Sequence, residues 1–188
     1  MEIIKAIENR RSIRRFIDKE IDKNIIEKIL EAGISAPSAK NRQPWKYIVV
    51  TEKNKDEMLK TMKESIFKQD SRLIAPVEYT MRIMAESPIT VFVINMENKI
   101  SLNQTLEEKF VEMTNIQSIG ASIQNMLLAA FDYGIGSLWI CDIYFAYKEL
   151  SKWLNTEQQI IAAVCFGYTD EKPLPHSRKE REELVEWK

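Results

Sequence analysis

Seven residues near the amino terminus, from Arg10 to Phe16, concentrate side chains that bind anions. Four arginines and one hydroxyl lie in this stretch: Arg10, Arg11, Ser12, Arg14 and Arg15. A guanidinium group offers a planar fork of N–H donors that matches two oxygens of a phosphate, and a neighbouring hydroxyl can add a further donor. A solvated basic turn at a helix end would have the same composition. The stretch therefore indicates either a local anion site or a solvated turn.

Two further segments carry groups suited to binding a flat, polar molecule. Residues 35–45 include two prolines, several short polar side chains and no periodicity, which predicts an ordered loop. Its amides, Asn41 and Gln43, could read the edge of a heterocycle, although loop amides also cap their own turns. In the later turn 133–137, Gly136 would let backbone N–H groups approach a flat ligand, and a plain helix-to-strand turn fits as well. Taken alone, neither segment identifies a ligand.

The chain has few of the residues that metal binding or hydrolytic catalysis requires. His176 is its one histidine, which argues against a histidine-rich metal site and against a Ser/His/Asp arrangement. Cys141 and Cys165 each lie in an apolar run, which favours small buried thiols over metal ligands, nucleophiles or a disulfide. Both kinds of chemistry are therefore disfavoured.

The whole-chain composition is that of an ordinary globular protein. The chain has 188 residues, of which 45% are hydrophobic and 29% charged, which predicts a single domain over 1–188. Its formal net charge of −1 provides no global basic field for nucleic acid or an anionic membrane. The first residues do not resemble a signal peptide, and no apolar run is long enough to span a membrane. We therefore expect a cytoplasmic protein.

Hydrophobic periodicity predicts which elements position the arginines. Ile3, Ile4 and Ile7 predict a short helix that packs one face on a core and leads directly into Arg10. Asp22 predicts the start of a second helix, which Gly33 would end in the left-handed conformation. The arginine stretch would therefore connect two helices.

Strands and helices alternate through the remainder of the chain. Strands are expected at 47–51, 89–95, up to Cys141 and at 160–167, and helices at 56–67, from a first turn containing Pro76 to Glu86, at 115–134 and at 146–154. Residues 96–114 are polar and poorly periodic, which predicts a lid or a mobile loop. Small residues in the long helix, Gly120 to Ser122, permit close approach of a second helix in a dimer. The tail from Tyr168 could leave its own domain and dock on a partner subunit.

Five separated motifs resemble those of the FMN-dependent nitroreductases. Arg10–Phe16 resembles the phosphate motif of that family, Ala36–Trp45 its second flavin loop, and Ser118–Ala130 its central dimer helix. Gly134–Ser137 resembles the turn that contacts the flavin ring, and Gly167-Tyr168 with Arg178-Lys179 resembles its C-terminal glycine turn and basic pair. The resemblance covers nearly the whole chain, and 52–114 is its least diagnostic part.

The resemblance implies a fold and a set of cofactor contacts. The fold would be an α+β three-layer α/β/α sandwich with a mixed, mainly antiparallel sheet, forming an intertwined homodimer with two FMN sites at the subunit interface. The implied cofactor-binding residues are Arg10, Arg11, Ser12 and Arg14 at the phosphate and ribityl chain, joined by Arg178 and Lys179, with Pro37, Ser38 and Asn41 from the other subunit and with Ile135, Gly136 and Ser137 near flavin N5.

The activity implied by the resemblance is that of an NAD(P)H-dependent FMN oxidoreductase. NADH or NADPH would pass a hydride to flavin N5, and a nitroaromatic, quinone or similar small acceptor would be reduced in a second, ping-pong step. No side-chain acid or base is required for this chemistry, and no metal. Two alternatives stay open: another flavin reaction on the same fold, such as dehalogenation or flavin fragmentation, and a non-catalytic FMN-binding module.

Overall fold

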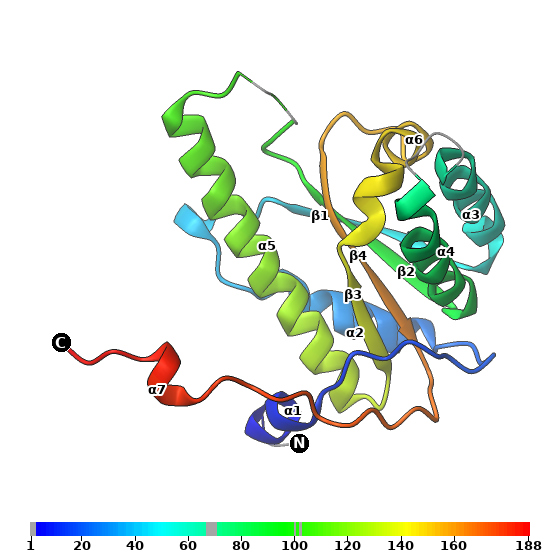
Figure 1. Ribbon diagram of the computed structural model, residues 1–188, viewed down its shortest axis with the longest axis horizontal. Coiled ribbons are helices and arrows are strands. Elements are labelled where there is room, and N and C mark those ends of the chain that lie inside the picture. Colours follow the sequence, from blue (N-terminus) through cyan, green and yellow to red (C-terminus); the bar gives the residue numbers. More distant parts are fainter. Residues whose placement is uncertain (1–2, 67–70, 100, 102) are drawn as a thin grey trace.

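In the computed structural model, a four-stranded sheet lies between two layers of helices (Figure 1). The structure describes residues 3–66, 71–99, 101 and 103–188. The strands are β1 (Trp45–Val50), β2 (Ile89–Asn95), β3 (Gly136–Ile140) and β4 (Gln159–Gly167), in the order β1-β2-β4-β3 with every neighbouring pair antiparallel. A single parallel bridge joins Ser12 to Ser137 at the β3 edge. The predicted α+β three-layer architecture with a mainly antiparallel sheet is therefore confirmed.

Alternation along the central strands divides the core into two halves. Val91 and Val93 of β2 pack toward α2 (Lys23–Ile34) and α5 (Leu106–Asp132), whereas Phe92 packs on the opposite face. That opposite face is covered by α3 (Glu52–Ile66), α4 (Ser71–Glu86), the short 3-10 helix η2 (Asp142–Ala146) and α6 (Tyr147–Trp153). All three β2 side chains are fully buried, which is why this strand is a continuous apolar run in the sequence.

Helix α2 begins as predicted but ends differently. The Asp22 carboxylate accepts a hydrogen bond from the Asn24 N–H at 2.8 Å, which confirms the predicted cap. Gly33 does not end the helix in a left-handed conformation, since it is a buried residue of the last helical turn and Ser35 is the C-cap. A Cβ at Gly33 would lie 2.7 Å from Met126 Cγ and 3.0 Å from the Tyr47 hydroxyl. The glycine therefore allows α2 and α5 to pack closely.

The lid predicted at 96–114 is wrong for its second half. Helix α5 begins at Leu106, nine residues before the predicted start, so 106–114 is its first part. Thr105 and Glu108 form a capping box in which the Thr105 hydroxyl accepts from the Glu108 N–H and the Glu108 carboxylate accepts from the Thr105 N–H. Residues 100 and 102 of the predicted loop, and Phe67 of the predicted 56–67 helix, lie outside the described residues.

Two other local predictions need correction. Helix α1 (Ile3–Asn9) forms, but Ile3, Ile4 and Ile7 are 53–66% exposed, so their stripe does not pack on the core of this chain. Pro76 lies inside α4 and not in its first turn, because the helix already begins at Ser71. Within the described residues, no helix is long and apolar enough to cross a bilayer.

The remaining segments are a short turn and an extended tail. The 3-10 turn η1 (Ala39–Asn41) precedes β1, and α7 (Arg181–Leu184) lies near the end of the tail. The tail runs away from the body of the molecule (Figure 1). Its apolar side chains are exposed in the single chain, with Leu174 at 83% and Trp187 at 91%.

Candidate functional site

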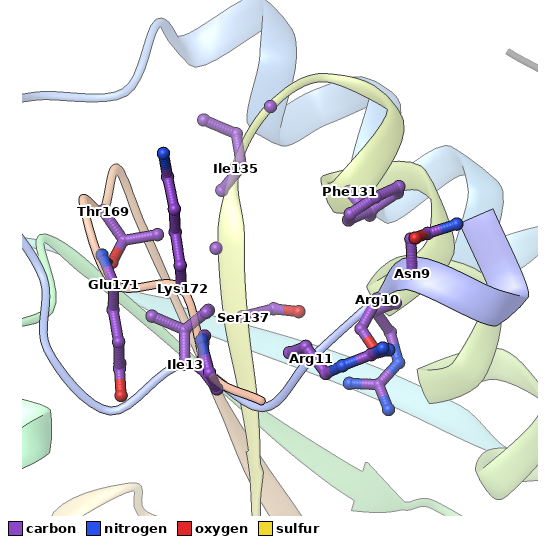
Figure 2. A pocket seen from close by; sticks show the side chains of 13 residues that line it. Asn9, Arg10, Arg11, Ile13, Phe131, Ile135, Ser137, Thr169, Glu171 and Lys172 are labelled. Atoms are coloured by element: carbon purple, nitrogen blue, oxygen red, sulfur yellow. Dashed lines mark hydrogen bonds between the residues drawn. The ribbon is translucent and has the colours of Figure 1, made fainter. Parts of the chain in front are cut away.

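One pocket, called the main pocket below, lies where residues 10–16 (the arginine segment), β3 and the chain after β4 meet. It has a volume of about 380 Å³. Figure 2 shows Arg10 and Arg11 on one side, Thr169, Glu171 and Lys172 on the other, and Ser137 between them. The full lining is Asn9, Arg10, Arg11, Ile13, Phe131, Gly134, Ile135, Gly136, Ser137, Thr169, Glu171, Lys172 and Pro173.

Backbone hydrogen bonds hold the arginine segment against β3 and against the chain that follows β4. The Ile13 N–H donates to the Ser137 carbonyl at 3.0 Å, next to the parallel bridge between Ser12 and Ser137. The Ile17 N–H donates to the Tyr168 carbonyl at 2.9 Å. The arginine segment is therefore an ordered extra edge of the sheet, and not the solvated turn that its composition also allowed.

Arg10 and Arg11 line one side of the pocket, and Arg178 of the tail is close enough to Arg10 to repel it but does not itself line the pocket. The pKa of Arg10 is lowered, first by partial burial and then by repulsion from Arg11 and Arg178. Arg178 comes from the tail, where its guanidinium donates to the carbonyls of His176 at 3.4 Å and Ser177 at 3.3 Å. An anion at this place would relieve both the burial cost and the mutual repulsion, so the cluster is suited to a phosphate.

The turn after α5 forms the apolar wall of the pocket. Gly134 has a φ of +71°, which ends the helix, and Ile135 and Gly136 follow directly into β3. A Cβ at Gly136 would lie 2.9 Å from Thr169 Cγ2 and 3.1 Å from the Gly167 carbonyl oxygen. The close contact that requires glycine here is therefore with the protein's own chain. Ile135, Gly136 and Ser137, for which the resemblance implies contacts near flavin N5, all line the pocket.

Arg14 is not brought into the main pocket with Arg10. Its side chain lines a separate cavity, described below, and its guanidinium donates to the Ser12 carbonyl at 3.3 Å. Ser12 contributes to the sheet-edge bridge but is not part of the pocket lining. Lys179 is exposed and does not line the pocket either.

Glu171 is a structural partner of the arginine segment that its sequence position did not reveal. Its Oε2 accepts from the N–H of Arg14 at 2.7 Å and from the N–H of Arg15 at 3.0 Å. Thr169 supports the same corner, since its hydroxyl donates to the Arg15 carbonyl at 2.8 Å. The only hint of this contact in the sequence was the polar run 169–172, directly after the predicted strand and Tyr168. In the structure this run folds back over the arginine segment.

The loop residues Pro37, Ser38 and Asn41 lie on a different part of the chain's surface. The Ala39 N–H donates to the Ser118 hydroxyl at 3.3 Å, which places this loop against the middle of α5. Phe131, which lines the main pocket, is 13 residues further along the same helix. At a rise of 1.5 Å per residue the two places are about 20 Å apart, so one chain does not bring all predicted residues together.

Within the single chain, the polar groups of that loop satisfy one another. The Gln43 N–H donates to the Ser38 hydroxyl at 3.0 Å, and the Gln43 amide donates to Asn41 Oδ1 at 3.3 Å. Lys40, Asn41 and Gln43 have φ values of 49° to 54°, in the left-handed region that non-glycine residues seldom adopt. Strained backbone of this kind is concentrated at ligand-binding sites, where the surrounding contacts maintain it.

Neither cysteine has the setting of a nucleophile. Burial raises the pKa of Cys165 to about 11, so its thiol stays neutral at physiological pH. Cys141 is exposed, so the expectation of a buried thiol is wrong for this residue. Partial desolvation and the neighbouring Asp142 raise its pKa. In the part of the chain that the structure describes, no group of three or more His, Cys, Asp or Glu side chains could hold a metal ion.

Comparison with known proteins gives one consistent result. The model of the nitroreductase family matches residues 7–168. An Archaeoglobus fulgidus protein, whose name proposes NADH dehydrogenase or NAD(P)H nitroreductase activity, is 35% identical over 177 residues, covering 91% of this chain and 88% of that protein. The Vibrio harveyi NADPH-flavin oxidoreductase is 26% identical over 174 residues, covering 90% of this chain and 67% of the enzyme.

A solved structure extends the similarity to three dimensions. It is that of a Desulfovibrio desulfuricans protein described as a nitroreductase, crystallised in complex with FMN. The two structures superpose with a TM-score of 0.78 and 26% sequence identity, covering 100% of this chain and 97% of the other.

Proposed function

The chain belongs to the nitroreductase family, and from this premise we propose that it is an FMN-dependent oxidoreductase using NADH or NADPH to reduce a small acceptor. The relatives include one protein named as an NADPH-flavin oxidoreductase and a solved neighbour that contains FMN. The residues of the main pocket must therefore be tested against the chemistry of that cofactor.

The pairing of Arg10 and Arg11 in the pocket lining, with Arg178 of the tail near Arg10, is the observation that carries the proposal. A phosphate monoester is a compact dianion, and forked guanidinium donors bind its oxygens in two-point geometry. The lowered pKa of Arg10 follows from burial and from two neighbouring cations, which is the setting that a bound anion would stabilise. The residues present therefore fit the phosphate end of FMN.

Apolar side chains on both sides of the pocket suit a flat ring. Ile13, Phe131 and Ile135 give the pocket apolar walls, and Ser137 is buried between them on β3 (Figure 2). Its volume of about 380 Å³ falls in the usual range for small-molecule sites. When bound, FMN would supply the redox chemistry by accepting a hydride at flavin N5 and passing electrons to the acceptor.

The protein's own residues would bind and orient FMN and would exclude water from its ring. The three arginines would hold the phosphate, and the apolar walls would keep water from the ring. Lys172 lies on the side of the pocket opposite Arg10 and Arg11 (Figure 2), where a positive charge would stabilise negative charge that develops during reduction. No described side chain is needed as a general acid or base in this scheme.

A second copy of the chain would complete the site. The loop with Pro37, Ser38 and Asn41 packs on α5 at Ser118, about 20 Å along that helix from Phe131 of the main pocket. A homodimer in which this loop reaches the partner's pocket would bring both sets of residues to one cofactor. The exposed stripe of α1 and the exposed apolar tail supply surfaces for such an interface.

Anaerobic mixing of the FMN-loaded protein with NADH or NADPH tests the function directly. We expect loss of the oxidised flavin absorbance with at least one nucleotide, and reoxidation when a nitroaromatic or a quinone is added. A bound flavin that neither nucleotide reduces would instead favour a non-catalytic FMN-binding module.

A further inference from the structure

A second charged cavity adjoins the main pocket and plays no part in holding FMN in the scheme above. We call it the arginine notch, and it is lined by Arg14, Arg15, Tyr79, Arg82, Glu86 and Glu171. Its volume is about 400 Å³. Glu171 also lines the main pocket, so the two cavities share a wall.

The two carboxylates of the notch are engaged by the backbone. Glu171 Oε2 accepts from the N–H groups of Arg14 and Arg15, and Glu86 Oε2 accepts from the Phe16 N–H at 3.4 Å. These bonds fix the backbone of the arginine segment and direct the carboxylate oxygens toward it. The carboxylates therefore act as supports of the notch.

The guanidinium groups of the notch come from two separate elements. Arg14 and Arg15 belong to the arginine segment, whereas Arg82 belongs to α4 and lies 5.1 Å from the centre of the Tyr79 ring. No ion pair between described residues involves any of these three guanidinium groups. Three arginines against two glutamates leave a formal charge of +1, carried by forked donors beside a cavity.

We propose that the arginine notch binds a phosphate group of the reduced pyridine nucleotide. This inference rests on the proposed function, because it assumes that the nucleotide passes its hydride to an FMN held in the adjoining main pocket. A dinucleotide carries its phosphates at a distance from the nicotinamide, so a second anion site next to the flavin pocket is what it requires. The Tyr79 side chain, 45% exposed at the rim, also offers an aromatic surface to the rest of the nucleotide.

Two phosphates of the nucleotide share this chemistry and can be separated by experiment. The 2′-phosphate occurs only in NADPH, whereas the pyrophosphate occurs in both nucleotides. Arg82→Gln and Arg15→Gln each remove one forked donor of the notch and leave the main pocket lining unchanged. Arg82→Lys retains the charge without the fork. Lys60→Gln, on the exposed surface of α3, is the matched control for loss of one positive charge.

The FMN content of each variant is measured first, because a colourless wild-type protein would overturn the proposed function and not the role of the notch alone. Anaerobic stopped-flow reduction then gives an apparent Kd and a limiting rate for NADH and NADPH. Calorimetric titration of the FMN-loaded protein with 2′,5′-ADP, ADP and AMP gives a binding readout that does not depend on turnover.

We expect the Arg82→Gln and Arg15→Gln variants to raise the apparent Kd by about tenfold or more, with the limiting rate unchanged. An effect restricted to NADPH and 2′,5′-ADP assigns the 2′-phosphate, and an equal effect on NADH, NADPH and ADP assigns the pyrophosphate. Arg82→Lys should recover part of the loss. If both glutamine variants keep wild-type Kd values for every nucleotide, the proposed role of the notch is wrong.

Discussion

Arg10 and Arg11 are partly buried at one side of the main pocket, and the exposed Arg178, from the other end of the chain, lies near Arg10. The pKa of Arg10 is lowered by burial and by these two neighbouring cations together. A phosphate bound there would convert repulsion into charge-assisted hydrogen bonding. Arg10 is therefore the residue at which FMN affinity should be most sensitive.

Arg10→Ala should weaken FMN binding by about 1.5–3 kcal/mol, the usual effect of losing a hydrogen bond to a charged group. This loss corresponds to a rise in Kd of roughly 10- to 150-fold. Quenching of flavin fluorescence during titration of the apoprotein measures it. Lys60→Ala, which removes an exposed charge on α3, should leave the Kd unchanged. An unchanged Kd for Arg10→Ala would mean that Arg10 does not bind the FMN phosphate.

Sequence reasoning identified the arginine segment but not the direction of each side chain. Arg10 and Arg11 line the main pocket, whereas Arg14 lines the arginine notch. The difference depends on Glu171, which holds the backbone of Arg14 and Arg15 from 156–157 residues away in the sequence. A contact at that separation leaves no local pattern, so residue types alone could not predict it.

Helices α2 and α5 pack so closely that a glycine is required between them. If Gly33 carried a Cβ, this atom would lie only 2.7 Å from Met126 Cγ. Tyr47, whose hydroxyl lies 2.5 Å from the Ser122 hydroxyl, limits movement on the other side. This contact holds α2 on the long helix that leads to the pocket.

Gly33→Ala should destabilise the protein even though alanine is the better helix former. Overpacking a core typically costs about 1–3 kcal/mol, whereas the gain in helix propensity is at most about 1 kcal/mol. Urea unfolding should therefore give a lower midpoint for the variant. The same substitution in a Met126→Ala background should lose this effect, because the closest contact is gone. An equal loss in both backgrounds would contradict the contact as its cause.

The elements themselves were largely predictable, and the errors have physical causes. Strand β2 was correct to the residue because it is buried on both faces and so lacks polar interruption. The first part of α5 was missed because polar residues outnumber apolar ones in 106–114, although Leu106, Phe110 and Met113 recur at the i, i+4 and i+7 spacing of a helix. The capping box of Thr105 and Glu108 was the available signal for its start.

Several large apolar side chains are exposed to solvent in the single chain. Ile3, Ile4, Phe110 and Trp187 are all more than half exposed. Such surfaces are typical of an interface between copies of a protein. Together with the distance between the loop at Pro37 and the main pocket, they make the homodimer the form in which we expect the site to be complete.

Light scattering coupled to gel filtration should give twice the chain mass of 22.0 kDa. Replacing Leu184 and Val185 of the exposed tail with glutamate should weaken the dimer and reduce FMN retention together, because both depend on the partner. Glu182→Gln, a polar change in α7 close to these two residues, should alter neither the dimer mass nor FMN retention. A wild-type mass of one chain with full FMN content would contradict the shared site.

The central claim is that the main pocket is an FMN site. The most direct test is the absorbance spectrum of the purified chain after incubation with FMN and removal of free flavin. We expect a yellow protein that retains one FMN per chain, with flavin bands shifted by the apolar walls of the pocket. A protein that stays colourless after this treatment would contradict it.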